Sequence, residues 1–596
     1  MQIRIDFADP DPTADGAVLK ALRCTFETPC QTLVAHRPEQ VAPLLDRVEQ
    51  LAHQGLWCVG YLRFEAASAF DRALITHHAD GPLAWFGVFD QAGPWPEDQV
   101  PQLQPTSPTI QSTTEVHWYP ALTRADFDAN MARIHQGIAA GAFYQVNYTA
   151  ALHGDFSGDP RQLFARLQRA QPGGFAAYID TGDEQILSVS PELFFDWQDG
   201  RILTRPMKGT APRGATAQED LALAQGLVTS AKERAENVMI VDLLRNDLSR
   251  VALPHSVEVP ALFKVQSLPT VLQMVSDVCA RTRAGTTLAE VFAALFPCGS
   301  VTGAPKVRAM QAICELEPES RGVYCGSMGV VRPGGHATFN VAIRTVTLRG
   351  NQARCGVGSG ITWDAQTDTE WREWQTKTGF LTRASTDFTL LETLRCEAGS
   401  YLHLRAHLAR LQAAARHFGY RFDPERVDTA LHRAANGADQ GVWRVRLQID
   451  ARGQVQCERF AVTDTPQPVT LALADRCFDA AHSEFTRFKT SQRAHYEAFV
   501  PIDPAIFDTL LYNAQGELTE CTRGNIALLL DGRWVTPALT CGLLPGIGRA
   551  HWLQQGRLVE AVVTVSDLPR VQAIAFVNSL RGWLDAQWAK PAPTAI

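Results

Sequence analysis

The sequence predicts a mixed α/β protein of the α+β kind, divided into two successive units. Apolar runs of strand type alternate along the chain with segments of helical periodicity, which favours a mixed fold. The chain has 596 residues, enough for two to four domains. A short polar stretch at residues 384–387 interrupts both patterns. We therefore expect one unit before this link and a second unit after it.

The composition is that of an ordinary globular protein, with 45% hydrophobic and 20% charged residues. The formal net charge is −8 and there is no long basic run, which argues against nucleic acid as a partner. No apolar run reaches the roughly 18 residues of a membrane span, and the first residues lack the apolar core of a signal peptide. The 13 cysteines show no Cys-x-x-Cys spacing, so we expect reduced thiols and a cytoplasmic location.

The first part of the chain, residues 1–120, has the pattern of strands joined by loops. Residues 57–62 and 83–89 are apolar runs of strand type. Residues 91–114 are rich in Pro, Gln, Ser and Thr, and we expect a surface loop there. This part is predicted to form an N-terminal lobe of the first unit.

A helix is predicted after this lobe. Thr123 and Asp126 have the spacing of a capping box, and apolar residues recur at helical spacing from Phe127 onward. Gly141 ends the pattern. A β-rich run that contains Gln145 follows, and it is expected to lead back into the core.

The segments around Glu192 and Lys208 point to a reactive site. Glu192 stands in a Ser-Pro-Glu motif, and Lys208 stands in a Met-Lys-Gly motif shortly after it. Asp199-Gly200 between them is a hairpin signal, so we expect Glu192 and Lys208 on neighbouring antiparallel strands. In a buried pocket such a pair would acquire shifted pKa values, whereas at a surface it would be an ordinary cross-strand ion pair.

Two further segments carry pairs of carboxylates at helical spacing. Glu233 and Glu236 lie in residues 231–248, which form a long helix or a helix followed by a strand, and Glu370 and Glu373 repeat the spacing. Such pairs are usually solvated helix faces. Two helices that face each other with these carboxylates would instead offer the oxygen ligands that Mg²⁺ prefers.

The motifs of the first unit resemble those of chorismate-utilising enzymes, which include anthranilate, isochorismate, salicylate and aminodeoxychorismate synthases. The resemblance covers residues 123–381 and includes the glycine-rich stretches 298–306 and 356–360. It implies that Glu192 is a general acid that helps the C4 hydroxyl leave. Lys208 stands where aminodeoxychorismate synthases have a lysine that attacks C2 of chorismate, and where anthranilate synthases have alanine.

The same resemblance implies the ligands of the site. Gln145 matches the glutamine of members that use ammonia, whereas members that use water have lysine there; the alternative is that Gln145 satisfies a strand hydrogen bond. Glu236 and Glu373 match the glutamates that hold Mg²⁺, and Arg344 and Lys377 would clamp the carboxylates of chorismate. The implied substrate-binding residues are Gln145, Gly209, Thr210, Thr302, Gly303, Tyr324, Arg344, Gly358 and Lys377.

The second unit, residues 388–596, begins with a helix that has an apolar stripe, residues 404–420, and an alternating strand, residues 442–450. A lone lysine, Lys489, follows in an Arg-Phe-Lys-Thr stretch, and Glu520 comes some thirty residues later. Most isolated lysines are solvated, so these residues alone indicate little.

The order of motifs in the second unit resembles fold-type IV pyridoxal-phosphate enzymes, the family of branched-chain and D-amino-acid aminotransferases and aminodeoxychorismate lyase. By this resemblance, Lys489 forms the Schiff base and Glu520 pairs with the pyridine nitrogen. Arg410 and the backbone amides of Ile547 and Gly548 would hold the phosphate. Aminotransferases usually have threonine where Gly548 stands, so that contact would come from the backbone only.

Together the two resemblances imply a complete architecture and function. A β-sandwich-like chorismate-binding domain with helices, residues 121–383, would be followed by a two-subdomain fold-type IV domain. The first unit would convert chorismate and ammonia into 4-amino-4-deoxychorismate with Mg²⁺, and the second would release pyruvate to give 4-aminobenzoate, a folate precursor, with pyridoxal 5′-phosphate. No third block carries a nucleophilic cysteine, so a separate glutamine amidotransferase is expected as the ammonia source. A homodimer through the second unit is one expected assembly.

Three alternatives remain open at the level of the sequence. The first unit would be an anthranilate-type or salicylate-type enzyme if Lys208 and Gln145 did not have the roles given above. The second unit would be an amino-acid aminotransferase if it passed an amino group to a 2-oxo acid. Either unit would be a regulatory binding module if the purified protein showed no turnover.

Overall fold

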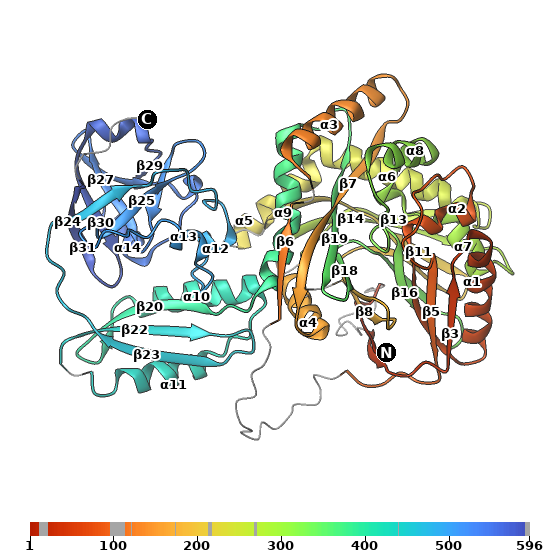
Figure 1. Ribbon diagram of the computed structural model, residues 1–596, viewed down its shortest axis with the longest axis horizontal. Helices are drawn as coiled ribbons and strands as arrows, with labels where there is room; N and C mark the ends of the chain where they lie inside the picture. Colours follow the sequence, from red (N-terminus) through yellow and green to blue (C-terminus); the bar gives the residue numbers. More distant parts are fainter. Residues whose placement is uncertain are drawn as a thin grey trace. The chain divides into compact units, whose positions relative to one another are not determined.

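The computed structural model describes residues 1–10, 22–95, 114–120, 122–172, 174–212, 217–267, 271–438 and 440–589. The chain divides into two compact units, Met1–Thr386 and Asp387–Ile596 (Figure 1). Both contain helices and strands, so the predicted mixed α/β class is confirmed. Most of the loop predicted at residues 91–114 lies outside the described residues. Within the part of the chain that the structure describes, no helix has the length and apolar character needed to cross a membrane.

The first unit is built on two large, mostly antiparallel sheets. The nine-stranded sheet has the order β15-β7-β19-β18-β9-β8-β1-β2, with β6 beside β7. Its strands are β1 (Ile3–Phe7), β2 (Leu22–Phe26), β6 (Glu115–Tyr119), β7 (Gln145–Ser157), β8 (Phe175–Asp180), β9 (Gln185–Ser190), β15 (Gly303–Ala304), β18 (Thr345–Arg349) and β19 (Gln352–Ile361).

The ten-stranded sheet has the order β12-β14-β11-β10-β17-β16-β4-β5-β3, with β13 beside β14. Its strands are β3 (Gln31–Ala35), β4 (Trp57–Leu62), β5 (Ala84–Phe89), β10 (Leu193–Gln198), β11 (Arg201–Arg205), β12 (Met207–Pro212), β13 (Glu258–Ser267), β14 (Val271–Arg281), β16 (Ser327–Val331) and β17 (Ala337–Val341).

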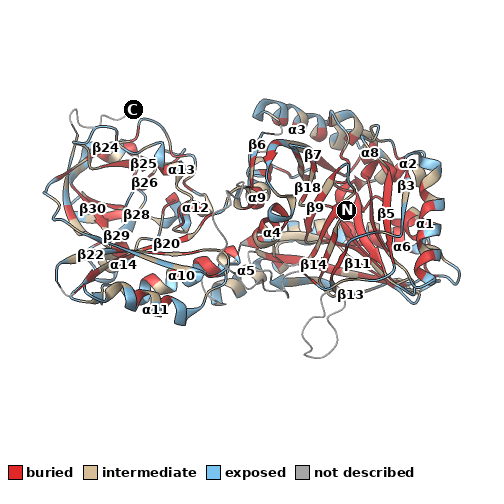
Figure 2. Ribbon diagram, turned by 60° about the horizontal axis from the view of Figure 1, so that its bottom comes forward, coloured by how far each residue is buried: buried red, intermediate tan, exposed pale blue. Residues whose placement is uncertain are grey.

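The two sheets pack face to face as the predicted sandwich. Ile3 and Ile5 of β1 share one buried cluster with Val59 and Tyr61 of β4, and buried residues follow the strands of both sheets in Figure 2. A second cluster joins the ten-stranded sheet to several of the helices. The helices of this unit are α1 (Pro38–His53), α2 (Ala67–Phe70), α3 (Arg124–Ala139), α4 (Pro160–Ala170), α5 (Ala217–Thr229), α6 (Ala231–Ser249), α7 (Leu288–Leu295), α8 (Lys306–Leu316) and α9 (Thr367–Ser385).

Local sequence signals set several of these elements correctly. The hydroxyl of Thr123 accepts the backbone N–H of Asp126 at the start of α3, and Gly141 has a φ of +70° just beyond its end, as predicted. Asp199 and Gly200 both have positive φ and join β10 to β11 in a two-residue hairpin. The segment after residue 230 is a single helix, α6, so the alternative with a strand is wrong.

The prediction that Lys208 lies on a strand beside Glu192 needs a correction. β11 is the strand that pairs with β10, and Lys208 lies in the next strand, β12. β12 continues along β14 beyond the end of β11, and Pro206, which has no N–H to donate, stands between them. Glu192 lies directly before β10. The Glu192 carboxyl accepts the backbone N–H of Met207, the residue before Lys208, so the two residues are close without direct strand pairing.

The second unit has two sheets of different size. The four-stranded sheet has the order β21-β20-β22-β23, and the eight-stranded sheet has the order β26-β25-β24-β31-β30-β27-β28-β29. The predicted helix is present as α10 with Gly419 at its end, and the predicted strand is present as β22. The elements are β20 (Leu390–Glu397), β21 (Ser400–Tyr401), α10 (Leu404–Phe418), α11 (Pro424–Ala435), β22 (Val442–Ile449), β23 (Val455–Ala461), β24 (Val469–Leu473), α12 (Glu484–Arg487), α13 (Ala494–Glu497), β25 (Asp508–Tyr512), β26 (Leu518–Cys521), β27 (Asn525–Leu530), β28 (Arg533–Pro537), α14 (Ile547–Gln554), β29 (Val559–Ala561), β30 (Val571–Asn578) and β31 (Gly582–Trp588).

Candidate active sites

Three predicted residues of the first unit meet where the two sheets end. Gln145 begins β7, Glu192 precedes β10, and Lys208 lies in β12. Gly360 of β19 shows how close two of them are: a Cβ atom placed on it would lie 2.2 Å from Nε2 of Gln145 and 3.1 Å from Nζ of Lys208. Only glycine leaves this space free beside the amide and the amine.

Gln145 and Glu192 carry buried polar atoms that no described residue satisfies. The two side chains are 1% and 4% exposed. Both polar atoms of the Gln145 amide and Oε1 of Glu192 lack hydrogen-bond partners among the described residues. Leaving such a group unpaired costs about 1–3 kcal/mol. The alternative that the Gln145 side chain satisfies a strand is therefore wrong, and the arrangement fits a bound polar molecule that completes these hydrogen bonds.

The environment of Glu192 suits an acid that works near neutral pH. Burial raises its pKa to about 7, against the opposing effects of the Ser300 hydroxyl and the Lys208 ammonium. A carboxyl group with this pKa is protonated in a large fraction of molecules at pH 7, so it can donate a proton. Ser300 lies in the glycine-rich stretch before α8, and sequence reasoning missed it because no spacing rule connects it to Glu192.

Glu236 of α6 and Glu373 of α9 lie close enough to affect each other electrostatically. Burial raises the pKa of Glu236, and the Glu373 carboxylate adds to this. Burial acts in the same direction on Glu373, but the Lys377 ammonium, 2.6 Å away, outweighs it and holds the pKa of Glu373 below its usual range. The two helices thus bring together the carboxylates predicted to bind metal.

Glu236 and Glu373 form the donor set for the predicted Mg²⁺. Among the described residues, no group of three or more His, Cys, Asp and Glu side chains is arranged to hold a metal ion. Mg²⁺ needs fewer protein ligands, because it keeps several waters and takes oxygens from its substrate. Two facing carboxylates, Glu236 and Glu373, therefore fit Mg²⁺ that binds together with an anionic ligand.

Cationic and aromatic residues complete the surroundings of this site. Burial lowers the pKa of Arg344, whose guanidinium lies 5.1 Å from the ring centre of Phe380. Burial also lowers the pKa of Lys377, which donates to the carbonyl of Gly358 at 2.9 Å. The ring of Tyr324 fills the place where a Cβ of Gly356 would lie. Two partly buried cations beside a glycine-lined strand suit a ligand with carboxylates.

The remaining predicted residues lie in or directly beside two short strands, β15 and β12. Gly303 of β15 pairs with β7, and the carbonyl of Thr302 accepts the N–H of Asn147 at 2.8 Å. Gly209 of β12 has the Glu233 carboxylate 2.9 Å from the place of a Cβ. The hydroxyl of Thr210 donates to the Gln273 side chain at 2.8 Å, so its hydroxyl is committed within the protein.

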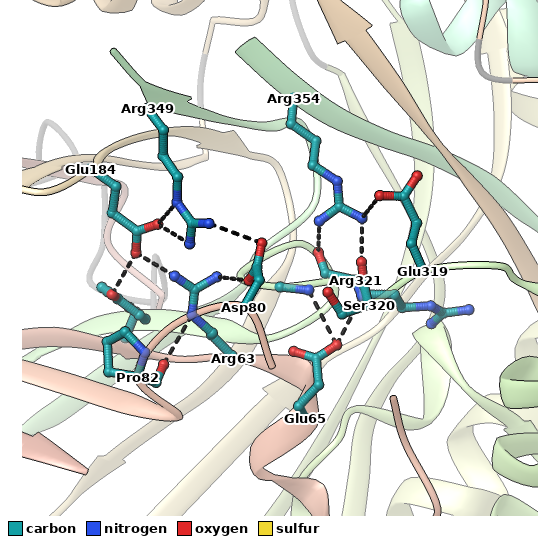
Figure 3. Close-up of polar contacts among 12 residues, drawn as sticks. Arg63, Glu65, Asp80, Pro82, Glu184, Glu319, Ser320, Arg321, Arg349 and Arg354 are labelled. Atoms are coloured by element: carbon teal, nitrogen blue, oxygen red, sulfur yellow. Dashed lines mark hydrogen bonds and ion pairs between the residues drawn. The ribbon is translucent and has the colours of Figure 1, made fainter. Parts of the chain in front are cut away.

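A cavity of about 760 Å³ in this unit shares Tyr324 with the site but contains none of Gln145, Glu192 and Lys208. Figure 3 shows two polar networks, of which the one around Arg354 includes part of the cavity wall. Arg354 reaches the carbonyl of Ser320 and the carboxylate of Glu319, and a separate network joins Arg63, Asp80, Glu184 and Arg349. These charges are paired within the protein, whereas the predicted reactive side chains lie around Gly360.

In the second unit, Lys489 follows α12 and is partly buried. Burial lowers its pKa to about 8, and the nearby cations Arg410 and Arg493 act in the same direction. A lysine with a lowered pKa is uncharged in a larger fraction of molecules at neutral pH and is a better nucleophile. The prediction of a reactive lysine thus has a physical basis that its local sequence does not contain.

Glu520 lies at the end of β26, near Lys489. Its Oε1 accepts the Tyr496 hydroxyl at 2.7 Å and the Leu544 N–H at 3.0 Å. Burial nevertheless raises its pKa to about 7. A protonated ring nitrogen beside this group would favour its ionised form, so Glu520 fits the predicted partner of a pyridinium. Tyr496 was missed from the sequence because nothing in its neighbourhood marks it as a partner of Glu520.

The predicted phosphate cradle combines α10 with the start of α14. Arg410 of α10 donates to Glu392 and, at 3.1 Å, to the carbonyl of Pro545. Ile547 and Gly548 are the first residues of α14, where backbone N–H groups have no acceptor inside the helix. A Cβ on Gly548 would lie 2.5 Å from the backbone of Asn578, which explains why this chain has glycine and not threonine. These residues and Lys489 fit pyridoxal 5′-phosphate.

Comparisons with known proteins agree with both resemblances. The chorismate binding enzyme family matches residues 17–383, and the amino-transferase class IV family matches residues 389–587. Aminodeoxychorismate synthase component 1 of Salmonella typhimurium is 39% identical over 308 residues, which are 52% of this chain and 67% of that protein. The protein of the same name from Escherichia coli is 39% identical over 310 residues, again 52% of this chain and 67% of that protein.

A solved structure supports the fold of the first unit. Anthranilate synthase component I from Streptococcus pneumoniae aligns with a TM-score of 0.50 and 24% identity, over 63% of this chain and 88% of that one. The first family match alone covers more than half of the 596 residues. The chain belongs to the family of chorismate binding enzymes and carries, in the same polypeptide, a domain of the amino-transferase class IV family.

Proposed function

We propose that the first unit aminates chorismate to 4-amino-4-deoxychorismate and that the second unit converts this product into 4-aminobenzoate and pyruvate. The observation that carries the proposal is the group of side chains around Gly360: the partly buried amine of Lys208, the buried and unpartnered amide of Gln145 and, beside Lys208, the buried acid Glu192 with a pKa of about 7. The relatives named aminodeoxychorismate synthase component 1 support the first step. The second step is supported because it consumes the product of the first.

In the proposed amination, Lys208 adds to C2 of chorismate while Glu192 gives a proton to the C4 hydroxyl, which leaves as water. Ammonia then adds at C4 and Lys208 leaves C2, so the net change replaces a hydroxyl by an amino group. The amide of Gln145 would orient the ammonia through its carbonyl oxygen. Glu236 and Glu373 would hold Mg²⁺, which supplies positive charge to a carboxylate of chorismate. Arg344 and Lys377 would bind the carboxylates of the same molecule.

In the proposed lyase step, Lys489 would bind pyridoxal 5′-phosphate and Glu520 would keep its ring nitrogen protonated. The cofactor would supply an electron sink. When the amine of the substrate takes the place of Lys489 on the cofactor, Lys489 would be a free amine, and its pKa of about 8 suits it to remove the proton from the amine-bearing ring carbon. Aromatisation of the ring then drives out the enolpyruvyl side chain, which becomes pyruvate on protonation.

The proposal includes partners and location. Ammonia would come from a separate glutamine amidotransferase, and the second unit would form a homodimer. All 13 cysteines are free thiols, which supports a reducing compartment such as the cytoplasm.

One experiment tests the proposal as a whole. The purified chain is supplied with chorismate, an ammonium salt, Mg²⁺ and pyridoxal 5′-phosphate, and the products are identified by chromatography and mass. We expect 4-aminobenzoate and pyruvate in equal amounts. Anthranilate or salicylate as product would contradict the function of the first unit. Aminodeoxychorismate that accumulates, together with amino transfer to a 2-oxo acid, would identify the second unit as an aminotransferase.

A further inference from the structure

Glu392 of β20 is buried directly against Arg410, the residue assigned above to the cofactor phosphate. Nε and Nη2 of Arg410 donate to its two carboxylate oxygens at 2.8 and 2.7 Å. Nδ1 of His407, one helical turn before Arg410, lies 2.6 Å from the same carboxylate. Glu392 is 1% exposed. Burial opposes its ionisation, but Arg410 and His407 outweigh burial and lower the pKa of Glu392 to about 2, so it is a carboxylate at all working pH values.

The hydrogen bonds of Arg410 leave a defined part of its guanidinium free for a ligand. A guanidinium has five N–H donors. Glu392 takes two of them and the carbonyl of Pro545 takes a third, on Nη1. After these bonds, one donor on Nη1 and one on Nη2 remain. Two donors on neighbouring nitrogens form the fork that matches two oxygens of a phosphate.

We propose that Glu392 is a positioning residue for the cofactor: it holds one edge of Arg410 so that the remaining two donors meet the phosphate. This inference rests on the function proposed for the second unit. The bond from Arg410 to Pro545 also joins α10 to the loop that leads into Ile547 and Gly548. Arg410 and the two backbone amides are therefore held next to each other. The long side chain of Arg410 has more rotational freedom than the amides, and Glu392 restrains it.

The direction in which cofactor affinity changes when the Glu392 carboxylate is removed separates this positioning role from a simple effect of charge. A carboxylate beside a phosphate ligand reduces the local positive charge. If charge alone mattered, removal of the carboxylate would strengthen the binding of an anionic cofactor. If orientation matters, removal of the carboxylate weakens the binding of the cofactor, because the guanidinium of Arg410 is no longer held on one side. The glutamine in its place turns an N–H group toward a guanidinium, which cannot accept a hydrogen bond.

The test compares Glu392→Gln with the parent protein. Apoprotein is titrated with pyridoxal 5′-phosphate and, separately, with pyridoxal, which lacks the phosphate, and binding is followed by absorbance. We expect about 10- to 100-fold weaker binding of pyridoxal 5′-phosphate and little change for pyridoxal. A general loss of structure would weaken both ligands alike, so equal losses would overturn the proposal. Unchanged or tighter binding of pyridoxal 5′-phosphate would overturn it as well.

Further variants establish that Glu392 acts through Arg410. In an Arg410→Gln background, Glu392→Gln should cause no additional loss of affinity, and an additive loss would contradict the proposal. Glu484→Gln is the matched control, because Glu484 is a largely buried carboxylate of the same unit that pairs with His417 at 2.9 Å. It should keep the parent affinity for both ligands.

The outcome remains interpretable if the glutamine variant fails to fold. Glu392→Asp keeps the charge but shortens the side chain by one methylene, so it should lose less affinity for pyridoxal 5′-phosphate than a variant without the carboxylate, again without a change for pyridoxal. An aspartate variant with parent affinity for both ligands would contradict the orientation role. If the parent protein bound neither ligand, both the proposed function of the second unit and the role of Glu392 would be overturned. If the parent protein and the Glu392→Gln variant bound pyridoxal 5′-phosphate equally well, only the role of Glu392 would be overturned.

Discussion

At the scale of single residues, the proposed amination depends most directly on Lys208. We expect Lys208→Ala to lower the amination rate by about 10²–10⁴-fold or more, because the proposed role is covalent. The variant should still convert supplied 4-amino-4-deoxychorismate into 4-aminobenzoate. Lys264→Ala, on an exposed part of β13, serves as the control. Near-parental amination by the Lys208 variant would remove it from the reaction.

Glu192 leads to a prediction about pH. Its pKa is raised by burial to about 7, so the protonated form that donates to the leaving hydroxyl dominates below pH 7 and disappears above it. The kcat/KM of amination, measured at a fixed concentration of free ammonia, should therefore fall as the pH rises through about 7. In Glu192→Gln the rate should drop and this limb of the profile should vanish. A limb that persists in the variant would assign it to another group.

At the scale of elements, the end of β19 shapes the space around the nucleophiles. A Cβ on Gly360 would overlap the Gln145 amide and contact the Lys208 amine. Gly360→Ala should thus reduce amination at least tenfold while the melting temperature stays near that of the parent. Gly379→Ala in α9, where a Cβ meets nothing within 4 Å, is the matched control and should be fully active. Full activity of Gly360→Ala would place the reacting atoms elsewhere.

The pair of helices α6 and α9 leads to a prediction about metal removal. Glu236 and Glu373 come from these two helices, and both belong to the first unit. A chelator such as EDTA should stop consumption of chorismate and leave the lyase step on supplied substrate unchanged, and added Mg²⁺ should restore the first activity. Chorismate consumption that continues in EDTA would show that the two carboxylates serve the site without a metal.

At the scale of the whole molecule, the two units have separate cores. Each hydrophobic cluster of the described residues draws its members from one unit only. We therefore expect the two reactions to fail independently. Lys489→Ala should lose the visible absorbance of the bound cofactor, still consume chorismate at the parent rate and accumulate 4-amino-4-deoxychorismate, with almost no pyruvate released. Formation of 4-aminobenzoate at the parent rate would show that Lys489 does not carry the lyase step.

Features that depend on local pattern could be predicted from the sequence alone. The hairpin at Asp199-Gly200 and the cap of α3 at Thr123 follow from the backbone preferences of a few adjacent residues, and the structure contains both. Motif resemblance identified both families, because motifs preserve the residue types that the chemistry needs. The sequence also singled out Lys208 and Lys489 as the lysines to examine, although it contains no information about their surroundings.

The way in which these residues meet depends on contacts between distant segments and could not be predicted from the sequence. The hairpin of β10 and β11 ends before Pro206, and Lys208 lies in the next strand, β12, which pairs with β14. The raised pKa of Glu192 comes from its burial in the folded protein. Glu392 and Arg410 are likewise joined by the packing of α10 on β20. Burial and pairing depend on contacts between distant segments, and no local pattern encodes the electrostatic environment that those contacts create.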